Sequence, residues 1–137
     1  MIRLRTIFCS LMFVALTTTT LHAQVRVRPG MWENTLTASG KTATTSLCMK
    51  PAEAARSNGS PAMVRAGTEK ALAGTGCTLK NFKLEGNILA VTIVCAGSTV
   101  IQETKFQGSD SLEYTLTSTV GGVTNVKKVK KRRTGDC

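Results

Sequence analysis

The residues of this chain that could do chemistry are mainly cysteines. The chain has 137 residues and five cysteines, and four of these lie outside the first 23 residues. Those four are Cys48, Cys77, Cys95 and Cys137. Four thiolates could hold zinc, but the sequence contains no Cys-x-x-Cys pair. We therefore expect two disulfides, formed in an oxidising compartment, and neither a metal site nor a bound cofactor.

One cysteine pairing has a local argument. The segments 77–84 and 88–95 are typical of a β-hairpin, because Glu85-Gly86-Asn87 supplies residues suited to a tight reversal. A three-residue loop would place Cys77 opposite Cys95, and a two-residue Gly-Asn loop would shift this register by one. The two cysteines stay close in either case, which leaves Cys48 to pair with Cys137. That second bridge would close a loop of about 90 residues.

The usual catalytic groups are missing from the predicted mature chain. The only histidine is His22, which lies in the N-terminal segment. Its loss would remove the most frequent general base and the usual partner of a nucleophilic Ser or Cys. The eight carboxylates are scattered singly through the sequence. We expect no enzyme, and a hydrolase would need a carboxylate pair or a Ser–Lys dyad that the spacing does not indicate.

Residues 1–23 are predicted to be a secretory signal peptide. Arg3 and Arg5 form a charged start, 7–16 is a short apolar stretch, and Ala23 suits the last position before cleavage. The apolar stretch is too short for a spanning helix, which needs about 20 residues. We expect residues 24–137 to form one exported domain. Losing the two arginines lowers the formal net charge from +10 to +8.

A basic run near the C-terminus is the strongest local charge signal. It contains six basic residues in seven: Lys127, Lys128, Lys130, Lys131, Arg132 and Arg133. Such a run can bind an anionic envelope component, either lipid phosphate or a cell-wall polymer. Nucleic acid is a poorer partner, since the chain is predicted to be exported and no aromatic residues interleave the run. The alternative is a solvated strand. Because charge falls on both of its faces, we expect this strand to lie at a sheet edge or to project beyond the core.

Most of the chain has the period-two pattern of β-strands. Strands are expected over 31–38, 42–49, 77–84, 88–95, 100–106, 112–120 and 123–131. One segment around residues 51–73 is rich in alanine and is expected to be a short helical insertion, with candidate helices over 52–56 and 62–72, or else a mobile loop. The predicted fold is mainly β, an antiparallel sheet forming a small sandwich or partly open barrel.

Several motifs together resemble a known family. Pro29-Gly30-Met31-Trp32-Glu33 opens the domain, Cys48-Met49-Lys50-Pro51 follows a threonine-rich strand, and Gly135-Asp136-Cys137 closes the chain. These residues resemble a bacterial family of exported proteins catalogued as domain of unknown function 3617. The resemblance implies a periplasmic β-rich domain and no particular activity. With no catalytic set, the leading hypothesis is a non-enzymatic binding or envelope-associated module, with a small apolar ligand as one candidate partner.

Overall fold

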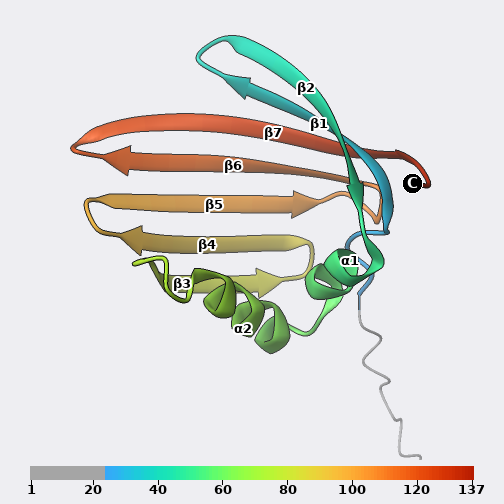
Figure 1. Cartoon of the computed structure of the whole chain (residues 1–137), viewed down its shortest axis with the longest axis horizontal. Coiled ribbons are helices and arrows are strands. Elements are labelled where there is room, and N and C mark those ends of the chain that lie inside the picture. Colours follow the sequence, from blue (N-terminus) through green and yellow to red (C-terminus); the bar gives the residue numbers. More distant parts are fainter. Residues whose placement is uncertain (1–23) are drawn as a thin grey trace, which may run out of the picture.

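One antiparallel sheet dominates the computed structural model, which describes residues 24–137 (Figure 1). The predicted signal peptide therefore lies outside the described residues. The strands are β1 (Gly30–Ala38), β2 (Lys41–Met49), β3 (Thr78–Glu85), β4 (Ile88–Cys95), β5 (Ser98–Phe106), β6 (Ser111–Val120) and β7 (Val123–Gly135). Two helices, α1 (Pro51–Asn58) and α2 (Pro61–Leu72), connect β2 to β3. The mainly β prediction with a helical insertion is confirmed, and the strands form a single sheet that does not close.

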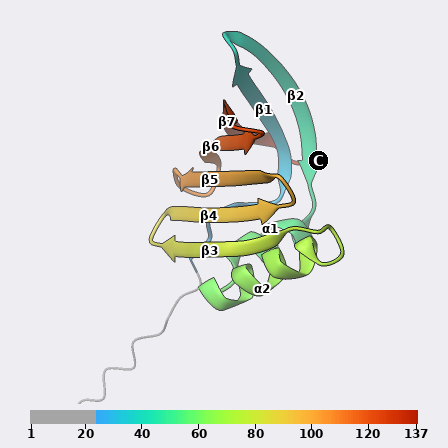
Figure 2. The same cartoon turned by 90° about the vertical axis from the view of Figure 1, so that its left-hand side faces the viewer.

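The position of β7 differs from the prediction. The strand order is β2-β1-β7-β6-β5-β4-β3, so β7 lies between β1 and β6 and pairs with both along most of its length. The expectation of an edge strand was wrong. An inner strand can carry charge on both faces when neither face is covered there, and most of the basic side chains of β7 are exposed. The sheet is strongly twisted, and β1 and β2 rise steeply away from β3, β4 and β5 (Figure 2).

The β3–β4 hairpin contains a register shift that explains its disulfide. Its turn is the two-residue form, because Glu85 pairs with Ile88. Continued without interruption, that register would place Cys77 one residue away from Cys95. A bulge at Lys80 shifts the register, so that Thr78 pairs with Val94 and the two cysteines come opposite each other. The Cys77–Cys95 bridge forms with a Cα–Cα distance of 4.1 Å.

Both helices begin with local signals that the sequence carries. In α1, Pro51 occupies the first turn and the Glu53 carboxylate accepts a hydrogen bond from the Lys50 backbone N–H at 2.7 Å. In α2, Pro61 again starts the helix, and the Ser60 hydroxyl accepts from the Met63 N–H at 3.3 Å. Within residues 24–137, neither helix is long and apolar enough to cross a membrane.

The buried core lies toward one end of the sheet, under α1 and the N-terminal segment. Its centre is Trp32, of which 2% is exposed, and its indole N–H donates to the Arg28 carbonyl at 3.0 Å. The other members of this cluster are Val27, Ala54, Leu84, Phe106 and Leu112. Among the described elements, α2 runs along β3, and no other strand is in extended contact with a helix. Much of the same sheet face is therefore left without a helical cover.

Residues 26–29 are joined to the rest of the fold by hydrogen bonds. The Asn58 side chain accepts from the backbone N–H groups of Arg26 and Val27 and donates to the Val27 carbonyl at 2.8 Å. The buried Arg26 guanidinium donates to the carbonyls of Ser57 and Gly59, at 3.0 Å each, and so caps the end of α1. Because the Asn58 side chain is engaged on both its oxygen and its nitrogen, it serves the fold at this turn.

Replacing Asp110 by Asn is expected to lower the melting temperature slightly near neutral pH and not at strongly acid pH. Asp110 forms an ion pair with Arg28, and the Arg28 Nε donates to its carboxylate at 2.8 Å. The hydrogen bond from Arg28 holds the pKa of Asp110 below its usual value. A lowered folded-state pKa stabilises the protein above the unfolded pKa, and this contribution is lost as the pH falls through the folded value. Melting curves at pH 7 and pH 2 measure this, and an equal deficit at both would contradict it.

Candidate functional site

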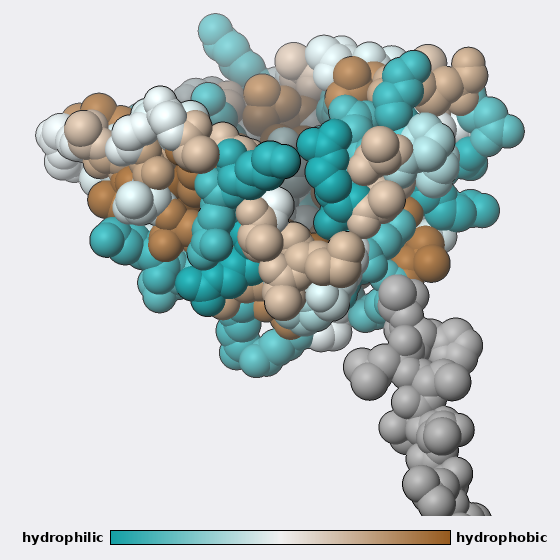
Figure 3. Space-filling model, turned by 60° about the horizontal axis from the view of Figure 1, so that its bottom comes forward, coloured by the Kyte–Doolittle hydropathy of each residue, from teal (hydrophilic) through white to brown (hydrophobic). Residues whose placement is uncertain are grey.

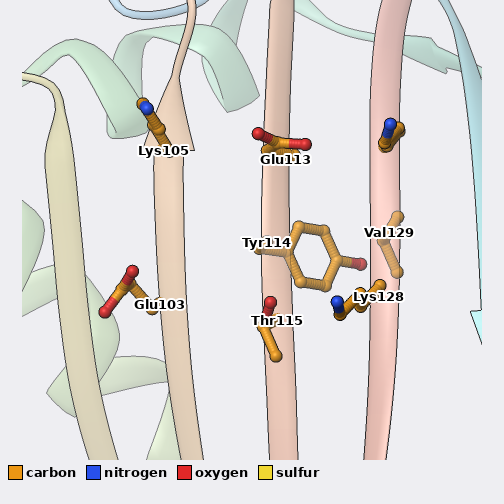
Figure 4. Close-up of a pocket in the computed structure, with 8 residues that line it drawn as sticks. Glu103, Lys105, Glu113, Tyr114, Thr115, Lys128 and Val129 are labelled. Atoms are coloured by element: carbon orange, nitrogen blue, oxygen red, sulfur yellow. The ribbon is translucent and has the colours of Figure 1, made fainter.

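The two faces of the sheet differ sharply in chemistry. Directly paired residues of antiparallel strands point to the same side, so the register assigns each side chain to a face. We call the face that carries Trp32, Phe106 and Leu116 the helix-side face, because the helices lie on that side. The other face, which carries Glu103, Glu113 and Lys128, is the open face; Figure 4 looks at it with the helices behind the sheet. Successive side chains of β7 point to opposite faces, so the residues of the basic run are divided between the two faces.

Charges on the open face nearly balance. Lys128, Lys130 and Arg132 of the basic run stand there, together with Lys83 and Lys105 of neighbouring strands. All four carboxylates of the described strands share this face: Glu33, Glu85, Glu103 and Glu113. Arg132 lies 3.6 Å from Glu33, and Lys83 lies 3.1 Å from Glu85. Such a surface is well solvated and offers an anion little excess positive charge.

A shallow depression of about 240 Å³ lies in the middle of the open face, and two carboxylates line it (Figure 4). They are Glu103 and Glu113, which occupy diagonal positions on β5 and β6. In Figure 4 Glu103 extends from β5 toward β4, whereas Glu113 lies over β6, and Glu103 is exposed. Glu113 also accepts a hydrogen bond from the Gln107 amide at 2.9 Å. Because the depression is shallow, these two side chains do not converge on an enclosed site.

The helix-side face carries basic and aliphatic side chains and no carboxylate from the described strands. Its basic residues are Lys41, Lys127, Lys131 and Arg133. Arg133 is engaged, because it pairs with Asp136 and its Nε donates to the Pro29 carbonyl at 2.7 Å. Lys127 and Lys131 have no ion-pair partner among the described residues. Uncompensated positive charge is therefore concentrated on this face.

Lys131 lies where the charge meets the core. Its ammonium is 5.5 Å from the centre of the Tyr114 ring, within the range of a cation–π interaction. Burial lowers the pKa of Lys131 and raises that of Tyr114. Asn34 is paired directly with Lys131 across β1 and β7, and its side-chain oxygen is buried without a hydrogen-bond partner. A partly desolvated ammonium group therefore lies on the strand next to a side-chain oxygen that has no hydrogen-bond partner.

Aliphatic side chains surround these lysines toward the end of the sheet that α1 leaves uncovered. Half-buried members of the helix-side face there are Leu36, Ile93, Val100 and Leu116. Leu47, Val120 and Val123 on the same face are more than half exposed. Viewed from the side of the helices, the molecule has a hollow near the middle, bordered by hydrophilic side chains (Figure 3). An aliphatic surface next to unpaired cations suits a ligand that is apolar at one end and negative at the other.

The two ends of the domain meet at one corner of the sheet. Gly30 has a φ of +135°, and a Cβ there would lie 2.3 Å from the Gly135 carbonyl oxygen, so only glycine fits. Cys137 bridges to Cys48 at a Cα–Cα distance of 5.7 Å, as predicted. The Pro-Gly and Gly-Asp-Cys motifs, far apart in the sequence, are therefore parts of one structural joint.

Sequence reasoning found the basic run but missed its partners. It grouped the six cations as one candidate anion site, whereas the structure places Lys127, Lys131 and Arg133 on one face and the other three on the opposite one. It also missed Lys105 and the strand carboxylates as neighbours of the run. The signal was present as the period-two parity of each strand, but which parity faces the helices depends on the strand order.

Comparison with known proteins gives a family and no function. A family model described as "Protein of unknown function (DUF3617)" matches residues 27–137. No curated protein and no solved structure matches the chain.

Proposed function

Because the chain belongs to the DUF3617 family, which has no known function, we propose an activity from the sheet alone: it binds an anionic amphiphile on the helix-side face. The ligand class is a single aliphatic chain with a carboxylate or phosphate head. The protein acts as a non-enzymatic binding module of the periplasm. The predicted signal peptide supports that location, and two disulfides are typical of proteins that fold outside the reducing cytosol.

The observation that carries this proposal is the segregation of charge between the two faces. All four strand carboxylates stand on the open face, and the helix-side face combines aliphatic residues with Lys127 and Lys131. The four carboxylates outside the strands are already engaged: Glu53 with a backbone N–H, and Glu69, Asp110 and Asp136 with arginines. A negative head group would therefore meet cations there with no carboxylate competing for them.

The ligand's two parts have separate roles in this proposal. Its chain covers the half-buried and exposed aliphatic residues around Leu116, which contributes about 25 cal/mol for each Å² removed from water. Its head accepts hydrogen bonds from Lys131 and Lys127. Because Lys131 is partly desolvated and unpaired, an anion at this position restores the partner that its charge lacks.

The test compares three ligands with the same dodecyl chain: dodecanoate, the neutral dodecyl maltoside and cationic dodecyltrimethylammonium. We expect dodecanoate to bind most tightly by calorimetry below the micelle concentration. The double variant Lys127→Gln, Lys131→Gln should weaken dodecanoate binding by at least about tenfold, because a hydrogen bond to a charged group contributes about 1.5–3 kcal/mol. Binding of dodecyl maltoside should change little.

The chain supplies its own matched control. Lys128→Gln, Lys130→Gln removes the same charge from the same strand on the open face, and we expect it to leave dodecanoate binding unchanged. Equal losses in the two double variants would contradict the proposal. So would binding of inorganic phosphate as tight as that of dodecanoate, which would instead favour a surface that adheres to anions in general.

A further inference from the structure

The two edges of the sheet are protected very differently. The β3 edge has α2 alongside it, a bulge at Lys80, and a second lysine, Lys83. Bulges, edge lysines and covering helices are the devices that stop a sheet edge from pairing with another chain. The β2 edge has only one of them, the lysine at position 41. Residues 41–47 are exposed, contain no proline or bulge, and carry a single charge at Lys41.

The turn before β2 determines which of its backbone groups point outward. Ser39 and Gly40 both have positive φ, 49° and 72°, which defines a two-residue type I′ hairpin. In such a hairpin the flanking pair, Ala38 and Lys41, is hydrogen-bonded, and bonded pairs then alternate along the ladder. The N–H and C=O groups of Thr42, Thr44 and Ser46 therefore point away from β1. Within residues 24–137 no other element pairs with this edge.

From these observations we infer that β2 pairs with β2 of a second copy of this chain, in antiparallel register about a two-fold axis. Centring the pair on Thr44 puts Ala43 opposite Thr45 and Lys41 opposite Leu47 of the second copy. No like charges then face each other, and cross-strand threonine pairs are favourable. β2 carries one charge, Lys41, and no carboxylate. In self-pairing Lys41 faces an uncharged residue, so the strand does not need a partner of opposite charge.

The size of this interface sets the strength of the dimer. An edge of about seven residues buries less surface than the roughly 1,200–2,000 Å² of a stable protein–protein interface. The dimer is therefore weak and depends on concentration. Because opposite residues of an antiparallel pair share a face, the helix-side faces of the two copies lie on the same side of one continuous sheet. Dimerisation depends on the β2 edge alone and does not require ligand binding.

Residue-resolved amide hydrogen exchange of the disulfide-bonded protein tests it, together with sedimentation at rising concentration. The exchange rates of the Thr42, Thr44 and Ser46 amides should fall at least about tenfold as the dimer becomes the main species. Those of Ala43, Thr45 and Leu47, bonded to β1, should be protected at every concentration. A protein that stays monomeric, or a dimer that leaves the three outer amides unprotected, overturns the inference.

Variants at Thr44 complete the test. Thr44→Pro removes an outward N–H without breaking a bond to β1, so it should abolish the dimer, whereas Thr44→Ser keeps the N–H and the dimer. Thr44→Lys brings two lysines together at the two-fold axis and is the second variant if the proline form fails to fold. A dimer that persists in the folded proline or lysine variant refutes the assignment. Protection that appears only after a foreign extended peptide is added would also refute it, by identifying a different occupant.

Discussion

Replacing Trp32 by alanine is expected to lower the free energy of unfolding by about 3–5 kcal/mol, the range for removing a large aromatic side chain from a core. Trp32 is 98% buried and lies among Val27, Phe106 and Leu112. It connects β1 to the N-terminal segment, because its indole N–H donates to the Arg28 carbonyl. Few other aromatic residues are available to fill the space. Urea denaturation followed by circular dichroism measures the change.

Trp32→Phe is the matched control for this variant. It keeps a ring in the core but removes the N–H, so that the Arg28 carbonyl loses its donor, at a cost of about 1–3 kcal/mol. If Trp32→Ala lowered the free energy of unfolding by less than about 1 kcal/mol, Trp32 would not be the centre of the core. Its buried side chain would then be better explained by a role in ligand binding.

Removing the Cys48–Cys137 disulfide, by changing both residues to serine, is expected to destabilise the protein by about 4–5 kcal/mol. The two cysteines are 89 residues apart, so the bridge constrains nearly the whole unfolded domain. In the folded protein it fastens the chain end after β7 to the end of β2, at the corner where Gly30 packs against Gly135. Serine keeps the shape of the site, and thermal melting under non-reducing conditions gives the change.

The second disulfide provides the comparison. Cys77 and Cys95 are 18 residues apart, and the same chain-entropy argument gives about 3 kcal/mol for their bridge. The Cys77→Ser, Cys95→Ser variant should therefore melt above the Cys48→Ser, Cys137→Ser variant. The reverse order would show that native contacts at the two sites, rather than loop length, set their contributions.

Local signals in the sequence predicted the elements well. The alternation of Leu112, Tyr114 and Leu116 with polar residues gave β6, and the proline before each candidate helix gave the starts of α1 and α2. The hairpin around Gly86-Asn87 gave the first disulfide, and elimination gave the second. Apart from the second disulfide, these predictions depend on neighbours within a few residues, whose side-chain preferences act before the chain has any tertiary structure.

Local sequence signals predicted only part of the candidate site. The basic residues of β7 were evident, and strict alternation already separates Lys127 and Lys131 from Lys128 and Lys130. What alternation does not say is which set shares a face with the helices or with the carboxylates of other strands. That depends on pairings between segments almost 100 residues apart, such as Asn34 with Lys131.

The sequence by itself predicted seven strands, the helical insertion and the two cysteine pairs, because strand period and turn chemistry are local properties of the chain and the hairpin pair left only one other pairing. Only the tertiary structure decided that β7 lies inside the sheet, that a bulge at Lys80 corrects the β3–β4 register, and that β2 is the unprotected edge. The physical reason is that strand order is set by the non-local pairing of backbone groups. Those groups are the same in every residue except proline, so the side-chain pattern of a single strand does not record which strand becomes its neighbour.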